Sequence, residues 1–230
     1  MFGSLRNFVY FCINNEQIIY FKAMKIERIS VAFVGVYNAI QPMIPGLDNK
    51  FCRHLYNNPD DTINGMSPDG YTISINNRPL PMVVINPQKI IFKSENIDTL
   101  TSYVCKVKQE FSKIGFGPQY AAFGINYEYQ FLDLNDKAES WINNKFLRPD
   151  IFGGKEKKCN VLSLRFDIDD SERVNMLFEP RVGIHNGVFM SINHHHASFL
   201  DELPKEDTLR DLFKQSESKI KNDFLPFLKH

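Results

Sequence analysis

The sequence predicts an α+β protein that is internally duplicated, each half forming a mostly antiparallel sheet with a short helix and a long C-terminal helix packed on one face. Three observations lead to this prediction: apolar and polar residues alternate in many short stretches, a helical apolar stripe closes each half, and the elements follow one order in both halves. The first half spans residues 24–117 and the second residues 118–230, after an N-terminal segment of residues 1–23. We expect the halves to form one continuous domain.

The composition is that of a globular protein with an ample core and no net charge. Of the 230 residues, 43% are hydrophobic and 20 are Phe, so a core can form without disulfides. Lys plus Arg equals Asp plus Glu at 27 each, and a neutral protein has no long-range field to attract a polyanion. This balance disfavours nucleic acid and an anionic membrane as partners.

The cysteines stand far apart, with no Cys-x-x-Cys pair that would indicate a zinc knuckle or a redox dithiol. A reduced, cytoplasmic setting is the simpler interpretation. No stretch has the ~18–20 apolar residues of a transmembrane helix, so we expect no membrane association. The cysteines are Cys12, Cys52, Cys105 and Cys159.

The N-terminal segment, residues 1–23, contains two short apolar runs separated by polar residues that begin at Asn14. Each run is shorter than the ~7–15 residues of a signal-peptide core. We predict a hairpin with Asn14 and Asn15 in the turn, because asparagine tolerates left-handed backbone angles. The alternative is a disordered leader that precedes Met24.

Each half opens with a strand-like run that leads into a short helical candidate. Asp or Asn near the start of each candidate can cap its first turn, and a Pro-Asp pair marks its end. Several β-rich segments follow, and Asn186-Gly187 is the strongest hairpin signal because both residues accept the positive φ of a type I′ turn. The opening runs are residues 29–37 and 120–131, the short helices lie within residues 47–60 and 134–150, and the later strands are residues 71–75, 82–85, 90–92, 161–168, 174–178, 182–185 and 188–192.

Each half closes with Asp-Thr-Leu at the start of a long amphipathic helix. The first helix runs from Asp98 to about Ile114, and the second from Asp207 to about Leu225. Apolar residues recur three or four positions apart in both, so each helix can lay one apolar stripe on a sheet. The stripes comprise Leu100, Val104, Val107 and Phe111 in the first helix, and Leu209, Leu212, Phe213, Ile220 and Phe224 in the second.

This order of elements resembles the repeated halves of the TATA-binding protein saddle and, more generally, the helix-grip folds. The resemblance implies that two units, each gripped by a helix, join edge to edge in one long curved sheet. It covers the order of elements and no sequence motif, so no functional residue transfers with it. The alternative is that two α+β segments share common residue types by chance.

Three consecutive histidines, His194 to His196, follow the strand at residues 188–192. In an extended chain His194 and His196 point to the same face, as two ligands of one zinc ion must. The alternative is an exposed polar strand end, since no His-Glu-x-x-His spacing occurs. The candidate metal ligands are His185, His194, His196, Asp167 and Asp169, a set that would activate a zinc-bound water.

Asp167 and Asp169 alternate at the end of a strand, so their carboxylates can share one face and act as an acid–base pair or a cation site. The polar residues that follow, through Glu172, make a turn between strands the alternative interpretation. The sequence has no nucleophile elbow, phosphate loop or dinucleotide fingerprint. We therefore assign no catalytic residue.

Tyr127, Tyr129 and Phe131 alternate with polar residues and place one aromatic face on a strand. Such a face can stack on nucleic-acid bases. It is also the ordinary pattern of a strand with one face on a core. Glu128 and the neutral overall charge favour the core interpretation.

The sequence supports three hypotheses of function. The leading one is a non-catalytic binding or assembly protein that offers a sheet face or edge to a protein partner or to a second copy of itself. The first alternative is a metal-assisted hydrolase that uses the His194 and His196 region. The second alternative is a nucleic-acid-binding sheet saddle.

Overall fold

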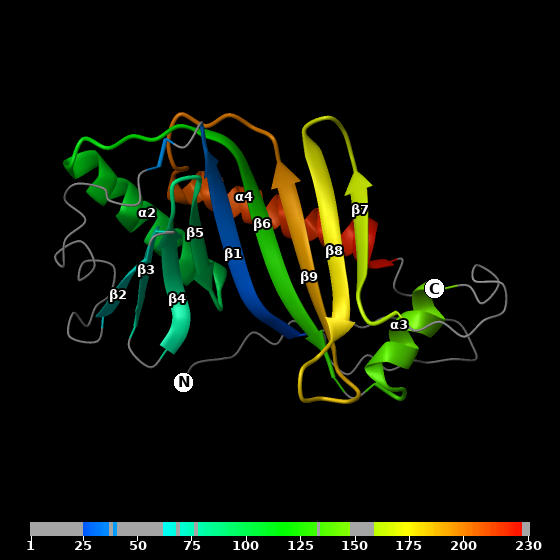
Figure 1. Ribbon diagram of the computed structural model, residues 1–230. Coiled ribbons are helices and arrows are strands. Elements are labelled where there is room, and N and C mark those ends of the chain that lie inside the picture. The colour runs from blue at the N-terminus through cyan, green and yellow to red at the C-terminus, as the bar shows by residue number, and fades with distance from the viewer. Residues whose placement is uncertain are drawn as a thin grey trace, which may run out of the picture.

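The computed structural model of the chain describes residues 25–36, 39–40, 62–67, 70–75, 78–132, 134–147 and 159–226 (Figure 1). Two predictions lie outside these residues: the N-terminal hairpin or leader at residues 1–23 and the short helix within residues 47–60.

Nine strands of the described residues form one antiparallel sheet in the order β2-β3-β4-β5-β1-β6-β9-β8-β7 (Figure 1). The predicted α+β class with an antiparallel sheet is confirmed. The strands are β1 (Lys25–Gly35), β2 (Thr62–Ser67), β3 (Gly70–Ile75), β4 (Arg78–Ile85), β5 (Lys89–Ser94), β6 (Tyr120–Phe131), β7 (Leu162–Asp167), β8 (Glu172–Pro180) and β9 (Val188–His196).

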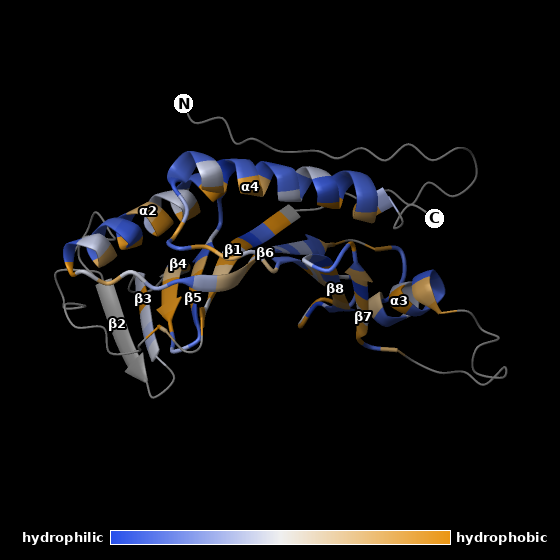
Figure 2. Ribbon diagram, turned by 90° about the horizontal axis from the view of Figure 1, so that it is seen from above, coloured by the Kyte–Doolittle hydropathy of each residue, from blue (hydrophilic) through white to orange (hydrophobic). Residues whose placement is uncertain are grey.

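The helices of the described residues pack on one face of this sheet. Helices α2 (Ile97–Lys113) and α4 (Glu206–Lys219) lie on the same side in Figure 2, and α4 continues into a π-helical turn, η4 (Ile220–Phe224). The shorter α3 (Ala138–Phe146) packs Phe146 against Phe178 of β8, a residue of the same face. The two long helices therefore begin and end close to where their apolar stripes predict.

The alternation along β6 decides which side chains enter the core. Tyr127 and Tyr129 are fully buried on the face toward the helices, and the Tyr127 hydroxyl donates to the Phe213 carbonyl of α4 at 3.2 Å. The polar residues between them, such as Glu128, point to the opposite face and are partly exposed. The aromatic alternation is thus a core face, and these two rings are unavailable for stacking on bases.

The two halves of the chain meet where β1 pairs antiparallel with β6 at the centre of the sheet. Phe33 pairs with Phe123 across this junction, and its fully buried ring packs against Phe92, Tyr120 and Phe123 with centroids 5.6–6.3 Å apart. Apolar contacts of this kind contribute stability in proportion to the area removed from water. The junction is therefore part of one hydrophobic core that extends into both halves.

The hairpin between β8 and β9 differs from the predicted one. The predicted strand at residues 182–185 is wrong, because residues 181–187 form a loop and Val182 is 95% exposed. The loop closes by a hydrogen bond from the Arg181 N–H to the Gly187 carbonyl at 2.7 Å, and Gly183, with φ of +79°, takes the left-handed conformation. The predicted hairpin between residues 182–185 and 188–192, with its two-residue turn at Asn186-Gly187, is therefore also wrong, because β9 pairs with β8 instead.

None of the helices in the described part of the chain combines the length and apolar character needed to cross a membrane.

Candidate metal centre

His194 and His196 share the helix-facing side of β9, whereas His195 points to the opposite face. Strand β9 extends to His196 because it pairs with β6 on one side and with β8 on the other. His194 lies opposite Ile125 of β6 and Val174 of β8. The side chain of His194 is 2% exposed, and its ring lies 4.2 Å from that of His196 between centroids. The period of two along the strand places both imidazoles together.

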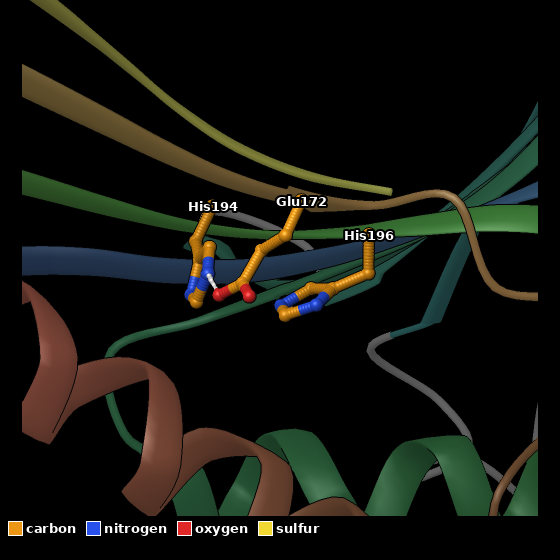
Figure 3. A group of neighbouring side chains, drawn as sticks. All are labelled: Glu172, His194 and His196. Atoms are coloured by element: carbon orange, nitrogen blue, oxygen red, sulfur yellow. Dashed lines mark hydrogen bonds and ion pairs between the residues drawn. The ribbon is translucent and has the colours of Figure 1, made fainter. Parts of the chain in front are cut away.

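Glu172 completes the group from the neighbouring strand. It is the first residue of β8 and pairs in register with His196. Figure 3 shows its carboxylate between the two imidazole rings, and one potential ligand atom from each residue lies within 4.8 Å of the others. Glu172 was not predicted as a ligand, because the sequence around it indicates a polar turn. Its spacing of two residues from Val174 was the signal that could have placed it on the same face of the strand.

A hydrogen-bond network orients His194. Its Nε2 lies 2.6 Å from Oε1 of Glu172, and its Nδ1 lies 2.8 Å from Oγ of Ser216 on α4. Because an ionised carboxylate only accepts, Nε2 carries the proton and Nδ1 accepts from the Ser216 hydroxyl. The Lys219 ammonium also contacts Oε1 of Glu172, at 2.8 Å.

The surroundings keep both histidines neutral near pH 7. Burial, with a smaller contribution from His194, lowers the pKa of His196 to about 4, and burial also lowers the pKa of His194. Burial alone would raise the pKa of Glu172, but hydrogen bonds from Lys219 and His194 outweigh it and lower that pKa. Neutral imidazole and ionised carboxylate are the protonation states that bind metals.

The three side chains lie on the wall of a pocket of about 570 Å³ between the sheet and α4. A pocket of this size suits a small molecule. Its lining comprises Phe123, Glu172, His194, His196, Ser198, Leu200, Pro204, Thr208, Leu212, Gln215, Ser216 and Lys219.

The donor set fits zinc after a small rearrangement. Zinc binds imidazole nitrogen and carboxylate oxygen at about 2.0–2.2 Å, which places tetrahedral ligand atoms about 3.3–3.5 Å apart. The present 2.6 Å between His194 Nε2 and Glu172 Oε1 spans a hydrogen bond, so the carboxylate must retreat by about 1 Å. Nε2 would then give up its proton, and Nδ1–H would donate to Ser216, the arrangement that commonly orients a metal-bound histidine.

The other predicted ligands do not join this group. His185 lies in the β8–β9 loop, beyond the opposite end of β9, where its carbonyl accepts from the Ala138 N–H. Asp167 forms an exposed ion pair with Arg165, and Asp169 accepts from the N–H groups of Ser171 and Glu172 in the turn before β8. Asp169 therefore lies in the turn just before β8, the strand that begins with Glu172, and its carboxylate is hydrogen-bonded to the backbone of that turn.

The chain matches none of the protein-family models with which it was compared, and no curated protein matches its sequence. The fold and the pocket define an α+β protein with a two-histidine, one-glutamate donor group.

Proposed function

We propose that this chain binds a divalent transition metal, zinc in particular, through Glu172, His194 and His196, and acts as a metal-assisted hydrolase on a small molecule in the adjoining pocket. The observation that carries the proposal is the convergence of these three side chains, from two adjacent strands, on the wall of that pocket.

The chemistry of the donor set supports hydrolysis over a purely structural ion. Structural zinc sites have four protein ligands, whereas catalytic ones have three and leave one position for water or substrate. Such an ion lowers the pKa of bound water from 15.7 to about 7 and thereby supplies a nucleophile at neutral pH. The residues of this chain would hold the ion, fix the His194 imidazole through Ser216 and shape the pocket.

The C-terminal end of α4 adds a second line of support. Lys219, which contacts Glu172, is the last residue of α4, and the π-helical turn η4 begins at the next residue. π-helical turns within α-helices occur frequently at functional sites, and here the π turn lies at the C-terminal end of α4. The change in helical winding therefore lies directly beside the proposed metal ligand.

Elemental analysis tests the proposal most directly. The untagged protein should be purified without added metal and without metal-affinity resin, and then measured before and after equilibration with zinc. We expect close to one zinc per chain after equilibration, lost in the His194→Ala/His196→Ala double variant. A wild-type protein that takes up no zinc would overturn the metal proposal, and a zinc-loaded protein without activity in a broad hydrolase screen would overturn the enzymatic one.

Replacing Ser216 by alanine is expected to weaken zinc binding by about 10- to 100-fold, the usual cost of removing a group that orients a metal-bound histidine. The hydroxyl is the partner of His194 Nδ1 in the core of the molecule. Ser218→Ala, on an exposed position of the same helix, is the matched control. Competition with a chromophoric zinc chelator measures both; equal affinities for the two variants would contradict the assigned role of Ser216.

We further propose that the scaffold is a duplicated, helix-grip unit with the topology of the TATA-binding protein saddle. Outward from the central pair, the strands read β1, β5, β4, β3, β2 on one side and β6, β9, β8, β7 on the other, so the first four correspond and β2 has no counterpart among the described residues. A long helix follows the last strand of each half along the chain. The match of order supports one ancestral unit. Superposition of the halves in an experimental structure tests it, and helices α2 and α4 that fail to coincide would overturn it.

A second candidate function, binding of a protein partner or a second copy, follows from the sheet face opposite the helices. In the described part of the chain no helix covers that face (Figure 2). It carries a row of three asparagines in register, in which Asn193 donates to Asn126 at 2.7 Å and Asn175 donates to Asn193 at 3.2 Å. Analytical ultracentrifugation tests self-association: a mass that rises with concentration and reverts in an Asn193→Arg variant supports it, and a monomer throughout excludes it.

A further inference from the structure

Lys219 is the cation of the pocket, and its present partner is the proposed metal ligand. Its Nζ lies 2.8 Å from Oε1 of Glu172, the same oxygen that accepts from His194 Nε2. The side chain is 30% exposed and lines the pocket. One carboxylate oxygen therefore serves two donors, both of which a metal ion on that oxygen would displace.

The charge of the pocket changes when an ion binds. Of the described residues that line it, Glu172 and Lys219 carry opposite charges, and histidine binds a metal as neutral imidazole, so the side chains sum to zero. A divalent ion raises the sum to about +2, and uncompensated charge in a partly buried site is costly. The Lys219 ammonium would also be repelled by an ion bound to Glu172. Because lysine is a point charge on a flexible stem, Lys219 can turn toward a ligand in the pocket.

The rest of the lining combines four apolar residues with four uncharged polar ones, Ser198, Thr208, Gln215 and Ser216. Phe123, Leu200, Pro204 and Leu212 contribute a hydrophobic wall. A ligand that satisfies both parts has a compact negative group and an apolar body.

We propose, on the basis of the metal site proposed above, that the pocket selects an organic carboxylate with an apolar chain. Its carboxylate contacts the open position of the metal and the Lys219 ammonium, and its chain lies against the wall formed with Leu212. In the proposed hydrolysis this carboxylate is the product of an ester or amide. Water would add to the carbonyl carbon and supply one carboxylate oxygen, and the bond to the leaving group would break. One proton of the water would go to the leaving group and the other to solvent, or to the amine when an amide is cleaved.

Calorimetric titration of the full-length, zinc-loaded protein tests this inference, with octanoate and octylammonium as probes of equal chain length. We expect octanoate to bind at least about 10-fold more tightly than octylammonium, as a charge-assisted contact requires. Lys219→Met should weaken octanoate binding by about 10-fold or more while zinc affinity stays equal or rises. Lys221→Met is the matched control, since Lys221 pairs with Glu217 on the helix and does not line the pocket.

The possible results distinguish the carboxylate inference from the metal proposal on which it rests. If the wild-type protein binds no zinc, both are overturned. If zinc binds but octylammonium competes equally, or the Lys219→Met variant binds octanoate as tightly as wild type, the carboxylate selectivity alone is overturned. A loss of octanoate binding in Lys221→Met equal to that in Lys219→Met would also overturn it, because the effect would then be one of helix structure.

Discussion

Replacing His196 by alanine is expected to lower zinc affinity by about 100-fold. Zinc sites with four ligands contribute roughly 10–16 kcal/mol, or about 3 kcal/mol for each ligand, and each 1.4 kcal/mol is a factor of ten in affinity. His196 is the better of the two histidines to remove, because it is only partly buried. Its ring stacks on Phe123 at 4.6 Å and lies 4.2 Å from the His194 ring between centroids. His194, by contrast, is 2% exposed and hydrogen-bonded at both nitrogens.

His195→Ala provides the matched control for His196→Ala. His195 is the adjacent residue of the same strand, but it faces the opposite side of the sheet and lines a different, polar pocket with Arg173. We expect its replacement to leave zinc affinity within about two-fold of wild type, measured by chelator competition with far-UV circular dichroism as a check on folding. Equal losses in the two variants would contradict a site confined to the helix-facing side.

Replacing Phe33 by alanine is expected to destabilise the protein by about 3–5 kcal/mol, the range for deletion of a buried aromatic side chain. Phe33 is fully buried at the β1–β6 junction, where three aromatic rings pack against it, so its removal would leave a cavity in the core. Since β1 and β6 are the strands through which the halves meet, the loss should lower the stability of both halves together. Guanidinium unfolding followed by fluorescence measures the change.

Phe199→Ala is the corresponding control, because Phe199 is 59% exposed in the segment after β9. A substitution at such a surface position usually changes stability by about 0.5 kcal/mol or less. If Phe33→Ala cost less than about 1 kcal/mol, or if the two halves of the variant unfolded in separate transitions, the central junction would not be the shared core described above.

Local patterns predicted the elements well where one face of each is buried. The strand at residues 120–131 coincides with β6, and the apolar stripes of the two long helices place α2 and α4. The prediction failed at residues 182–185, where an apolar, β-branched sequence lies in an exposed loop. The β-propensity of these residues was overridden because β8 pairs with β9, and residues 181–187 must then form the loop between the two strands. Local alternation of apolar and polar residues does not reveal which strands pair.

The candidate site was likewise predictable from the sequence only in part. That His194 and His196 share a face was predictable from the sequence alone, because the side chains of a strand alternate with a period of two. The identity of their partners was not: Glu172 reaches them through the register of β8 against β9, and Ser216 and Lys219 through the packing of α4 across the sheet. Register and helix placement depend on contacts between distant parts of the chain, so only the tertiary structure decided which side chains surround the two histidines.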